Sequence, residues 1–200
     1  MGKEPRKRIT SPDTKRSERV PPGQRATDKW PILHFGQVPK IDLETWRFKA
    51  FGLVEEEIEW TWEEFRKLPS CEVHSDWHCV TSWTKLDLLW TGVTARDVVA
   101  RIKVLSGSKA VMVHSYDGYS TNVLLNDFLE EDVIFAWAER GTEFHPEKGG
   151  PLRLVVPKLY AWKSAKWVSG IEFMAGDRPG YWEARGYHMR GDPWEEERYG

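Results

Sequence analysis

One cysteine stands in a segment whose residue types could do chemistry. Cys79 lies between Trp77 and Trp83 in the stretch SDWHCVTSWTKLDLLWTGV, residues 75–93. A thiol in this setting can be a buried structural group, a nucleophile or a soft metal ligand. Its neighbours do not decide among the three, and the chain's other cysteine, Cys71, lacks comparable surroundings. The chemistry therefore depends on a partner from elsewhere in the chain.

A run of basic residues in the second half of the chain offers such a partner. From 148 to 166 there is no Asp or Glu, and the basic residues are Lys148, Arg153, Lys158, Lys163 and Lys166. Gly149 and Gly150 at its start allow backbone amides to approach a ligand closely. Arginine can fork onto phosphate oxygens, and lysine adds a point charge. The cluster favours a site for a phosphate-bearing ligand, although any single lysine is more typical of a solvated strand.

The composition limits the class of protein. A chain of 200 residues suits one domain, and its twelve tryptophans require a large core or the walls of a cavity. A net charge of −2 excludes a globally basic nucleic-acid binder. Two cysteines without a C-x-x-C pattern predict neither a disulfide scaffold nor a zinc site. No apolar run approaches the length of a membrane span, so none is predicted.

Charge is unevenly distributed along the chain. Residues 1–29 hold nine Lys or Arg against four Asp or Glu and almost no apolar residues, which predicts a disordered or loosely packed basic arm. Residues 30–200 form the expected domain. The basic start is not followed by an apolar stretch typical of a signal peptide, which favours a cytoplasmic protein. Scarce Asn, Gln and Met with abundant Lys, Arg and Glu hint at a thermophilic source.

The hydrophobic pattern predicts strands interrupted by short helices. Strands are expected at 45–54, 110–116, 119–125, 133–139, 151–157 and 166–174. Thr61 and Thr94 are expected to cap short helices, Asn126 to cap another, and Asp117-Gly118 to form a hairpin turn. Because helices and strands do not alternate regularly, the predicted class is α+β, with mainly β mixed sheets. The tail from about residue 176 is expected to wrap the surface.

Three stretches resemble the molybdopterin-binding domain of the sulfite oxidase family. WPILHFGQVP (30–39) is similar to the family's N-terminal cofactor segment, and HCVTSW (78–83) to a Cys-Val-x-x-Trp segment. GGPLRLVVPKLYAWKSAKWVSGIEF (149–173) is similar to its Gly-x-Pro-x-Arg and Lys-Ser-x-Lys run. The resemblance spans about residues 30–175. It is closest to the bacterial branch that includes the catalytic subunit of periplasmic methionine-sulfoxide reductase.

The resemblance implies a cofactor, molybdenum bound to molybdopterin, and a role for each matching residue. Cys79 would be the catalytic residue and would bind the metal through its thiolate, while the pterin dithiolene supplies two further sulfurs. The pterin and its phosphate would be held by His34, Phe35, Thr121, Asn122, Lys148, Arg153, Ser164, Ala165 and Lys166. Since one protein ligand is enough, no second Cys or His ligand motif is expected.

The residues after the cysteine depart from the family pattern. Vertebrate and plant sulfite oxidases continue with a small residue, Gly, Asn and two arginines, whereas Val80, Thr81 and Ser82 follow Cys79. The sulfoxide-reducing branch has an acidic residue where Thr81 stands. The chain also lacks a C-x-x-C-H haem motif and the C-terminal immunoglobulin-like domain by which sulfite oxidases dimerise. These departures predict a monomer that exchanges electrons with a separate protein, carrying haem or a similar group.

The resulting hypothesis is a molybdenum-dependent oxidoreductase with one molybdopterin cofactor. It would transfer an oxygen atom to or from a small sulfoxide or N-oxide. Sulfite oxidation at the same site is an alternative, as are a non-catalytic molybdopterin carrier and a phosphate-binding module without metal. Metal analysis followed by dye-linked turnover would separate these possibilities.

Overall fold

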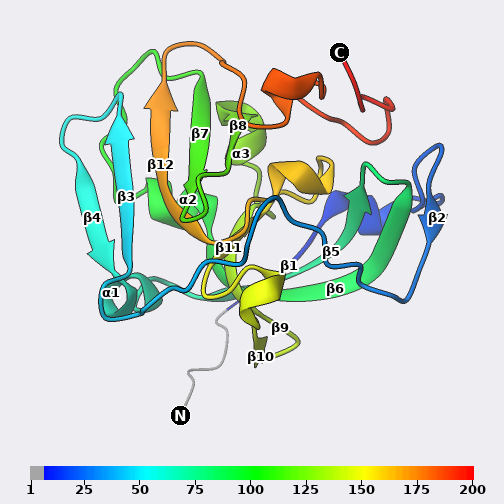
Figure 1. Cartoon of the computed structure of the whole chain (residues 1–200), viewed down its shortest axis with the longest axis horizontal. Helices are drawn as coiled ribbons and strands as arrows, with labels where there is room; N and C mark the ends of the chain where they lie inside the picture. Colours follow the sequence, from blue (N-terminus) through cyan, green and yellow to red (C-terminus); the bar gives the residue numbers. More distant parts are fainter. Residues whose placement is uncertain (1–6) are drawn as a thin grey trace.

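The computed structural model describes residues 7–200 and shows two β-sheets packed against each other (Figure 1). The larger sheet contains β1 (Arg8–Thr10), β2 (Arg25–Ala26), β5 (Cys71–Cys79), β6 (Trp83–Thr94), β9 (Ile134–Glu139), β10 (Thr142–Glu143) and β11 (Arg153–Val155). Its order is β1-β5-β6-β9-β10, with β2 beside β6 and β11 beside β9. The smaller sheet contains β3 (Arg47–Gly52), β4 (Ile58–Thr61), β7 (Ala110–Ser115), β8 (Ser120–Leu124) and β12 (Val168–Met174), in the order β4-β3-β12-β7-β8.

Short helices connect these strands. The α-helices are α1 (Trp62–Arg66), α2 (Ala95–Val99) and α3 (Leu125–Phe128), and the 3-10 helices are η1 (Pro12–Lys15), η2 (Pro146–Lys148), η3 (Ala161–Lys163) and η4 (Glu183–Arg185). Each sheet combines parallel and antiparallel pairs, since β1 runs parallel to β5 and β3 parallel to β12. The expected class, α+β with mainly β mixed sheets, is confirmed. No helix within residues 7–200 is long and apolar enough to cross a membrane.

Local sequence explains most of these elements. Trp46, Phe48 and Ala50 alternate with solvent-facing residues and are buried, as predicted for a half-buried strand. The backbone N–H of Glu64 donates to the Thr61 hydroxyl, and the backbone N–H of Thr61 donates to the Glu64 carboxylate. These two bonds complete the predicted capping box of α1. The prediction for α3 was wrong in its cap, because the helix begins after Leu124 with no side-chain cap.

The larger sheet carries packed aromatic residues on both faces, and one of these faces positions the site. Toward the smaller sheet, the ring of Phe135 on β9 packs 5.3 Å from that of Phe48 on β3. On the opposite face, Trp77 on β5 and Trp90 on β6 pack against Trp30, with ring centres 5.4 and 5.6 Å apart. β5 and β6 were not predicted, although β5 alternates apolar and polar residues along its sequence CEVHSDWHC, as a strand with one apolar face does.

The N-terminal segment is not loosely packed where the structure describes it. β1 pairs with β5 and β2 with β6 through backbone hydrogen bonds. The Arg19 guanidinium donates to the buried Asp76 carboxylate at 2.9 and 2.6 Å and to Asp87 at 2.7 Å. The expected disordered or loosely packed arm is therefore corrected for residues 7–29, because its positive charges meet carboxylates of the sheet. The same expectation for residues 1–6 lies outside the described residues.

The C-terminal tail lies against η3 and the β7–β8 hairpin, in keeping with the expected wrapping segment (Figure 1). Tyr181 donates its backbone N–H to Ser120 at 2.8 Å, and Gly191 accepts from the N–H of Tyr160 at 2.8 Å. Gly191 has φ of +80°, and a Cβ there would come within 2.6 Å of the Trp162 ring. Glycine is required at this position for both reasons, and the tail can thus close directly over the tryptophan.

Candidate active site

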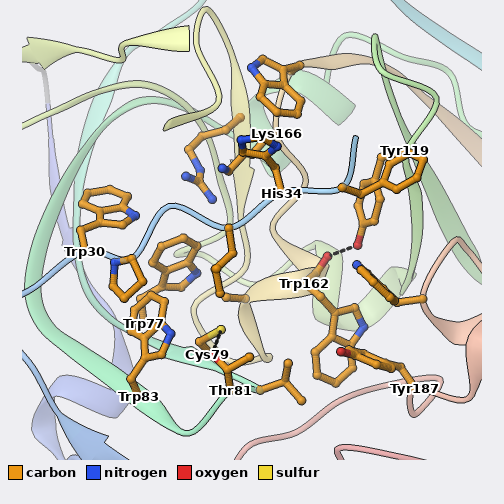
Figure 2. A pocket seen from close by; sticks show the side chains of 18 of the residues that line it. Trp30, His34, Trp77, Cys79, Thr81, Trp83, Tyr119, Trp162, Lys166 and Tyr187 are labelled. Carbon is orange, nitrogen blue, oxygen red and sulfur yellow. Dashed lines mark hydrogen bonds between the residues drawn. The ribbon is translucent and has the colours of Figure 1, made fainter. Parts of the chain in front are cut away.

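A cavity of about 320 Å³ opens on the face of the larger sheet that carries Trp77. Segment 30–35, which crosses in front of the sheets, forms one wall, and the C-terminal tail contributes another (Figures 1 and 2). Six of the twelve tryptophans line the cavity: Trp30, Trp77, Trp83, Trp162, Trp167 and Trp182. The walls of this one site therefore account for half of the unusual tryptophan content.

Cys79 ends β5 and lines this cavity. Its Sγ lies 3.2 Å from the Thr81 hydroxyl oxygen, and its backbone carbonyl accepts from the Gln24 side chain at 3.0 Å. Burial raises the pKa of the Cys79 thiol, because a thiolate is poorly solvated there. A bound cationic metal would offset this cost and favour the thiolate. Cys71, at the other end of β5, does not line the cavity, and burial raises its pKa to about 11.

Protein ligands for a metal are few around Cys79. No group of three or more His, Cys, Asp or Glu side chains within residues 7–200 is arranged to hold a metal ion. The neighbouring His78 is buried away from the cavity, with Nδ1 3.0 Å from the Thr84 hydroxyl oxygen, and burial lowers its pKa to about 4. A metal at Cys79 would need most of its ligands from a non-protein group, and a dithiolene sulfur pair meets that need.

Arg153 is a buried cation at the cavity wall. Its guanidinium donates to the backbone carbonyls of Lys148 at 2.8 Å and Ser164 at 3.3 Å, and lies 4.6 Å from the Trp77 ring centre. Nε has no partner, and no carboxylate acts on Arg153 within the described residues. Burial lowers its pKa to about 9. An unpaired buried cation is costly, so the residue is suited to an anionic ligand.

Lys166 lies close to Arg153 and strengthens this positive region. Its ammonium donates to the Glu147 carbonyl at 2.8 Å, while burial, with a smaller contribution from Arg153, lowers its pKa to about 7. Gly149 fits between them, since a Cβ there would lie 2.9 Å from Lys166 Cγ and 3.3 Å from Arg153 Cβ. Its φ of +102° also favours glycine. The predicted combination of glycine, arginine and lysine thus occurs as one compact cluster.

The other predicted cofactor residues divide into two groups. His34 and Phe35 line the cavity, where the His34 ring packs 5.6 Å from Trp167 and the Phe35 ring 4.1 Å from Tyr181. Five further residues do not line it: Thr121, Asn122, Lys148, Ser164 and Ala165. Those five are placed behind the wall or at its edge.

Hydrogen bonds explain where these five residues lie. The Thr121 hydroxyl donates to Glu183 at 3.0 Å, and the Asn122 amide donates to Asp177 at 2.7 Å, so both face the tail. The Ser164 hydroxyl accepts from the Val156 N–H at 3.0 Å, and the Ala165 carbonyl accepts from the Leu154 N–H at 2.8 Å. The Lys148 ammonium lies 4.5 Å from the Trp30 ring centre. Lys148 and Ser164 reach the site indirectly, through the carbonyls that accept from the Arg153 guanidinium.

Sequence reasoning missed several lining residues. Tyr119 and Asp117 enter from the β7–β8 hairpin, and Trp182 and Tyr187 from the tail. The only available signals were the Asp-Gly-Tyr turn and the high aromatic content of the tail. Neither signal identifies a cavity wall, because aromatic residues are equally common in an ordinary core.

The cavity has the features of a redox cofactor site: one soft sulfur donor, an unpaired pair of cations elsewhere on its wall, and aromatic walls. Comparison with known proteins agrees, because residues 35–182 match the family described as the oxidoreductase molybdopterin binding domain. The chain belongs to this family, and its cofactor is therefore molybdenum-molybdopterin.

Several named relatives are oxidoreductases. The uncharacterized oxidoreductase YuiH of Bacillus subtilis (strain 168) is 44% identical over 184 residues, which cover 92% of this chain and 93% of YuiH. YedZ1 of Azospira oryzae, a subunit assigned by name to protein-methionine-sulfoxide reductase, is 25% identical over 78% of this chain and 59% of its own. The NADH nitrate reductase of Ulva prolifera is 26% identical over 70% of this chain, which spans only 20% of that enzyme.

A solved structure shares the fold. The sulfane dehydrogenase SoxCD from Paracoccus pantotrophus superposes with a TM-score of 0.65 at 19% sequence identity, over 72% of this chain and 41% of that one. The likeness establishes a common architecture. The expected sulfite-oxidase-type molybdopterin fold is thus confirmed.

Proposed function

We propose that this molybdopterin oxidoreductase transfers an oxygen atom to or from a small neutral sulfoxide or N-oxide. Cys79 is the sole protein ligand to molybdenum in this proposal, and Arg153 and Lys166 hold the anionic end of the pterin cofactor. The observation that carries the substrate class is the distribution of charge along the cavity. Lys166 lies far from Cys79, and the wall close to Cys79 is apolar or hydroxylic (Figure 2).

The residues of the chain fit the cofactor. When bound, molybdenum-molybdopterin supplies two-electron oxygen-atom transfer chemistry. The Cys79 thiolate provides the metal ligand, with the Thr81 hydroxyl 3.2 Å from its sulfur. Arg153 has an unpartnered buried Nε, and Lys166 lacks a carboxylate partner, so a phosphate would relieve both. The aromatic walls restrict the access of water and would strengthen these interactions.

The surroundings of Cys79 favour a neutral substrate over sulfite. Sulfite is an anion near neutral pH and would need an arginine or lysine beside the metal ligand. Val80, Thr81 and Trp83 are the lining residues that follow Cys79, and Arg153 and Lys166 are the only Arg or Lys side chains among the described residues of the wall. Since these two are assigned to the cofactor phosphate, the space at Cys79 suits a neutral oxide.

More distant arginines are held elsewhere. Arg96 donates to the Leu129 carbonyl, Arg140 donates to the Asp87 carbonyl at 2.6 Å, and Arg185 lies 3.6 Å from the Tyr181 ring centre. None of the three lines the cavity. Arg198 approaches Cys79 from outside, donating to the Val80 carbonyl, and does not line the cavity either. None of these residues therefore offers sulfite a cationic pocket.

Electron exchange is proposed to involve a separate redox protein. The chain carries no C-x-x-C-H motif for covalent haem, and one relative, YedZ1, is named as a subunit of a reductase. The monomeric state and the cytoplasmic location expected from the sequence stay predictions.

Dye-linked kinetics test the proposal. The cofactor-loaded protein is assayed with a reduced viologen and a set of sulfoxides and N-oxides, and separately with sulfite and an artificial electron acceptor. We expect oxide reduction with a higher kcat/KM than sulfite oxidation. Efficient sulfite oxidation without any oxide turnover would refute the substrate class. Loaded protein inactive in both directions would instead indicate the carrier alternative.

A further inference from the structure

A buried ion pair lies directly behind the cavity. The Lys163 ammonium and Glu183 Oε1 are 2.6 Å apart, and both side chains are fully buried. Lys163 belongs to the acid-free basic run, yet its charge faces the tail instead of the cavity. Two charges are costly to bury, so the pair is weak evidence for a stabilising role and calls for another explanation.

The carboxylate of this pair holds a residue of the cavity wall. Glu183 Oε1 also accepts from the indole N–H of Trp162 at 2.8 Å. The Trp162 carbonyl accepts in turn from the Tyr119 hydroxyl at 2.6 Å, the contact drawn in Figure 2. Trp162 and Tyr119 both line the cavity. The indole N–H and the backbone carbonyl of Trp162 are therefore both fixed by specific partners.

Aromatic packing connects Trp162 to two residues of the tail. We define the tail wall as Trp162, Trp182 and Tyr187, all of which line the cavity. The Trp162 ring meets Tyr187 edge-on at 5.1 Å, and Tyr187 stacks on Trp182 at 5.0 Å. Behind Trp162 the ring of Tyr160 stacks at 5.2 Å. A shift of the Trp162 ring would consequently move the whole wall.

The Lys163 ammonium connects three segments of the chain. Besides Glu183, Lys163 donates to the backbone carbonyl and side-chain oxygen of Asn122, both at 2.9 Å, and to the Met189 carbonyl at 2.6 Å. It thus connects η3, β8 and the tail at one point. Its charge compensates the buried carboxylate, of which the second oxygen, Oε2, has no partner. The pair therefore connects the β7–β8 hairpin to the tail wall, and neither charged side chain lines the cavity.

We propose that Lys163 and Glu183 are positioning residues that fix the tail wall and thereby limit the size of oxide accepted beside Cys79. The proposal rests on the proposed function for the identity of the substrate. The position of the wall itself does not depend on that identity, so it can be measured independently.

The first measurement follows the wall without any activity. In ¹H–¹⁵N spectra of the cofactor-loaded protein, the Trp162 indole N–H signal is identified by its loss in Trp162→Phe. We expect Glu183→Gln to move this signal upfield, because a neutral amide accepts a weaker hydrogen bond than a carboxylate. The control is Glu63→Gln, which makes the same change in an exposed pair with Lys67 and should leave the signal in place.

The second measurement compares small and bulky sulfoxides. In Glu183→Gln we expect the ratio of kcat/KM for a bulky over a small sulfoxide to rise about tenfold, the scale of one or two methylenes in an apolar pocket. The double variant Lys163→Met with Glu183→Gln replaces the pair by neutral groups of similar size and should show the same change if Glu183→Gln alone folds poorly. Molybdenum content is measured throughout to exclude loss of cofactor.

The outcomes separate the two proposals. A lower melting temperature with an unchanged size ratio and an unchanged indole signal would show that the pair is only structural, and would overturn this inference. If the parent protein turns over no sulfoxide, the proposed function fails. The indole signal then still decides the positioning role, which an unmoved signal refutes and an upfield shift supports.

Discussion

The two ends of the cavity are built in opposite ways. At the Cys79 end the thiol sits among Val80, Thr81 and Trp83, without a lining cation. Elsewhere on the wall Arg153, whose guanidinium lies 4.6 Å from the Trp77 ring centre, and Lys166 lie together without a carboxylate partner. The first end can ligate a soft metal and accept a neutral molecule, and the second can hold an anion. In the proposed function the positive charge serves the cofactor, and the reacting end is uncharged.

The largest effect is expected at the thiol end. Cys79→Ser should abolish turnover, because a hydroxyl is a poor ligand for a thiophilic metal, and it should alter the paramagnetic signal of bound molybdenum. Cys71→Ser is the matched control, since Cys71 is also buried in β5 but lies outside the cavity. Equal activity in Cys79→Ser and the parent would defeat the assignment.

The cationic end should control cofactor occupancy. Arg153→Ala removes a charge-assisted contact worth about 1.5–3 kcal/mol, or roughly tenfold to a hundredfold in affinity for the pterin. Lys158→Ala, a half-exposed residue of the same basic run that pairs with Asp127, should keep full occupancy. Pterin and metal content of the purified variants measure this directly. Full occupancy in Arg153→Ala with reduced melting temperature alone would make Arg153 structural.

Lys166 should give the cationic end a pH dependence. Its pKa in the protein without cofactor is lowered to about 7, so the ammonium is increasingly lost above that pH. An anionic ligand binds the charged form better, and affinity of the apoprotein for molybdopterin should therefore fall as pH rises from about 7 to 9. Lys166→Arg, which stays charged, should flatten this fall. A profile identical in both proteins would contradict the role of Lys166.

Lys166 should also affect the stability of the apoprotein. Its contribution to stability should rise with pH, whereas the affinity for the cofactor should fall. Between pH 7 and the ordinary lysine pKa the unfolded chain binds more protons than the folded one, so this residue makes stability rise with pH in that window. Melting temperatures of apoprotein across the window, compared with those of Lys166→Gln, isolate the contribution.

A smaller effect, on thermal stability, is expected where the N-terminal segment contacts β5. Arg19→Ala leaves the fully buried Asp76 carboxylate without its guanidinium, at a cost of about 1–3 kcal/mol, or roughly 2–10 °C in melting temperature. Arg8→Ala removes an exposed arginine that pairs with Glu72 and should change stability by less than about 0.5 kcal/mol. Thermal melts of the two variants provide the test. An equal effect would mean that the segment is not anchored through Asp76.

The same contrast between the two ends explains how much could be predicted from sequence. Cys79, Arg153, Lys166, His34 and Phe35 were selected from short motifs, and all five line the cavity. Motifs succeed there because each of these residues belongs to a short stretch whose members are close together in the chain. The resemblance also predicted the family and the fold correctly.

Contacts between segments that are distant in the sequence could not be predicted from short motifs. Thr121 and Asn122 were selected as cofactor residues, but they hydrogen-bond to Glu183 and Asp177 of the tail. The docking of residues 7–29 relies on backbone pairing and on the contact of Arg19 with Asp76, neither of which requires an apolar pattern. Composition alone therefore predicted a loose arm.

X-ray absorption at the molybdenum edge tests the central claim most directly. In the parent protein we predict a metal ligated by the Cys79 sulfur in addition to the dithiolene pair. In Cys79→Ser loaded with the same cofactor, the number of sulfur ligands should fall by one, while Cys71→Ser should match the parent. A sulfur count that is unchanged in Cys79→Ser would contradict the assignment of the thiol end as the metal site.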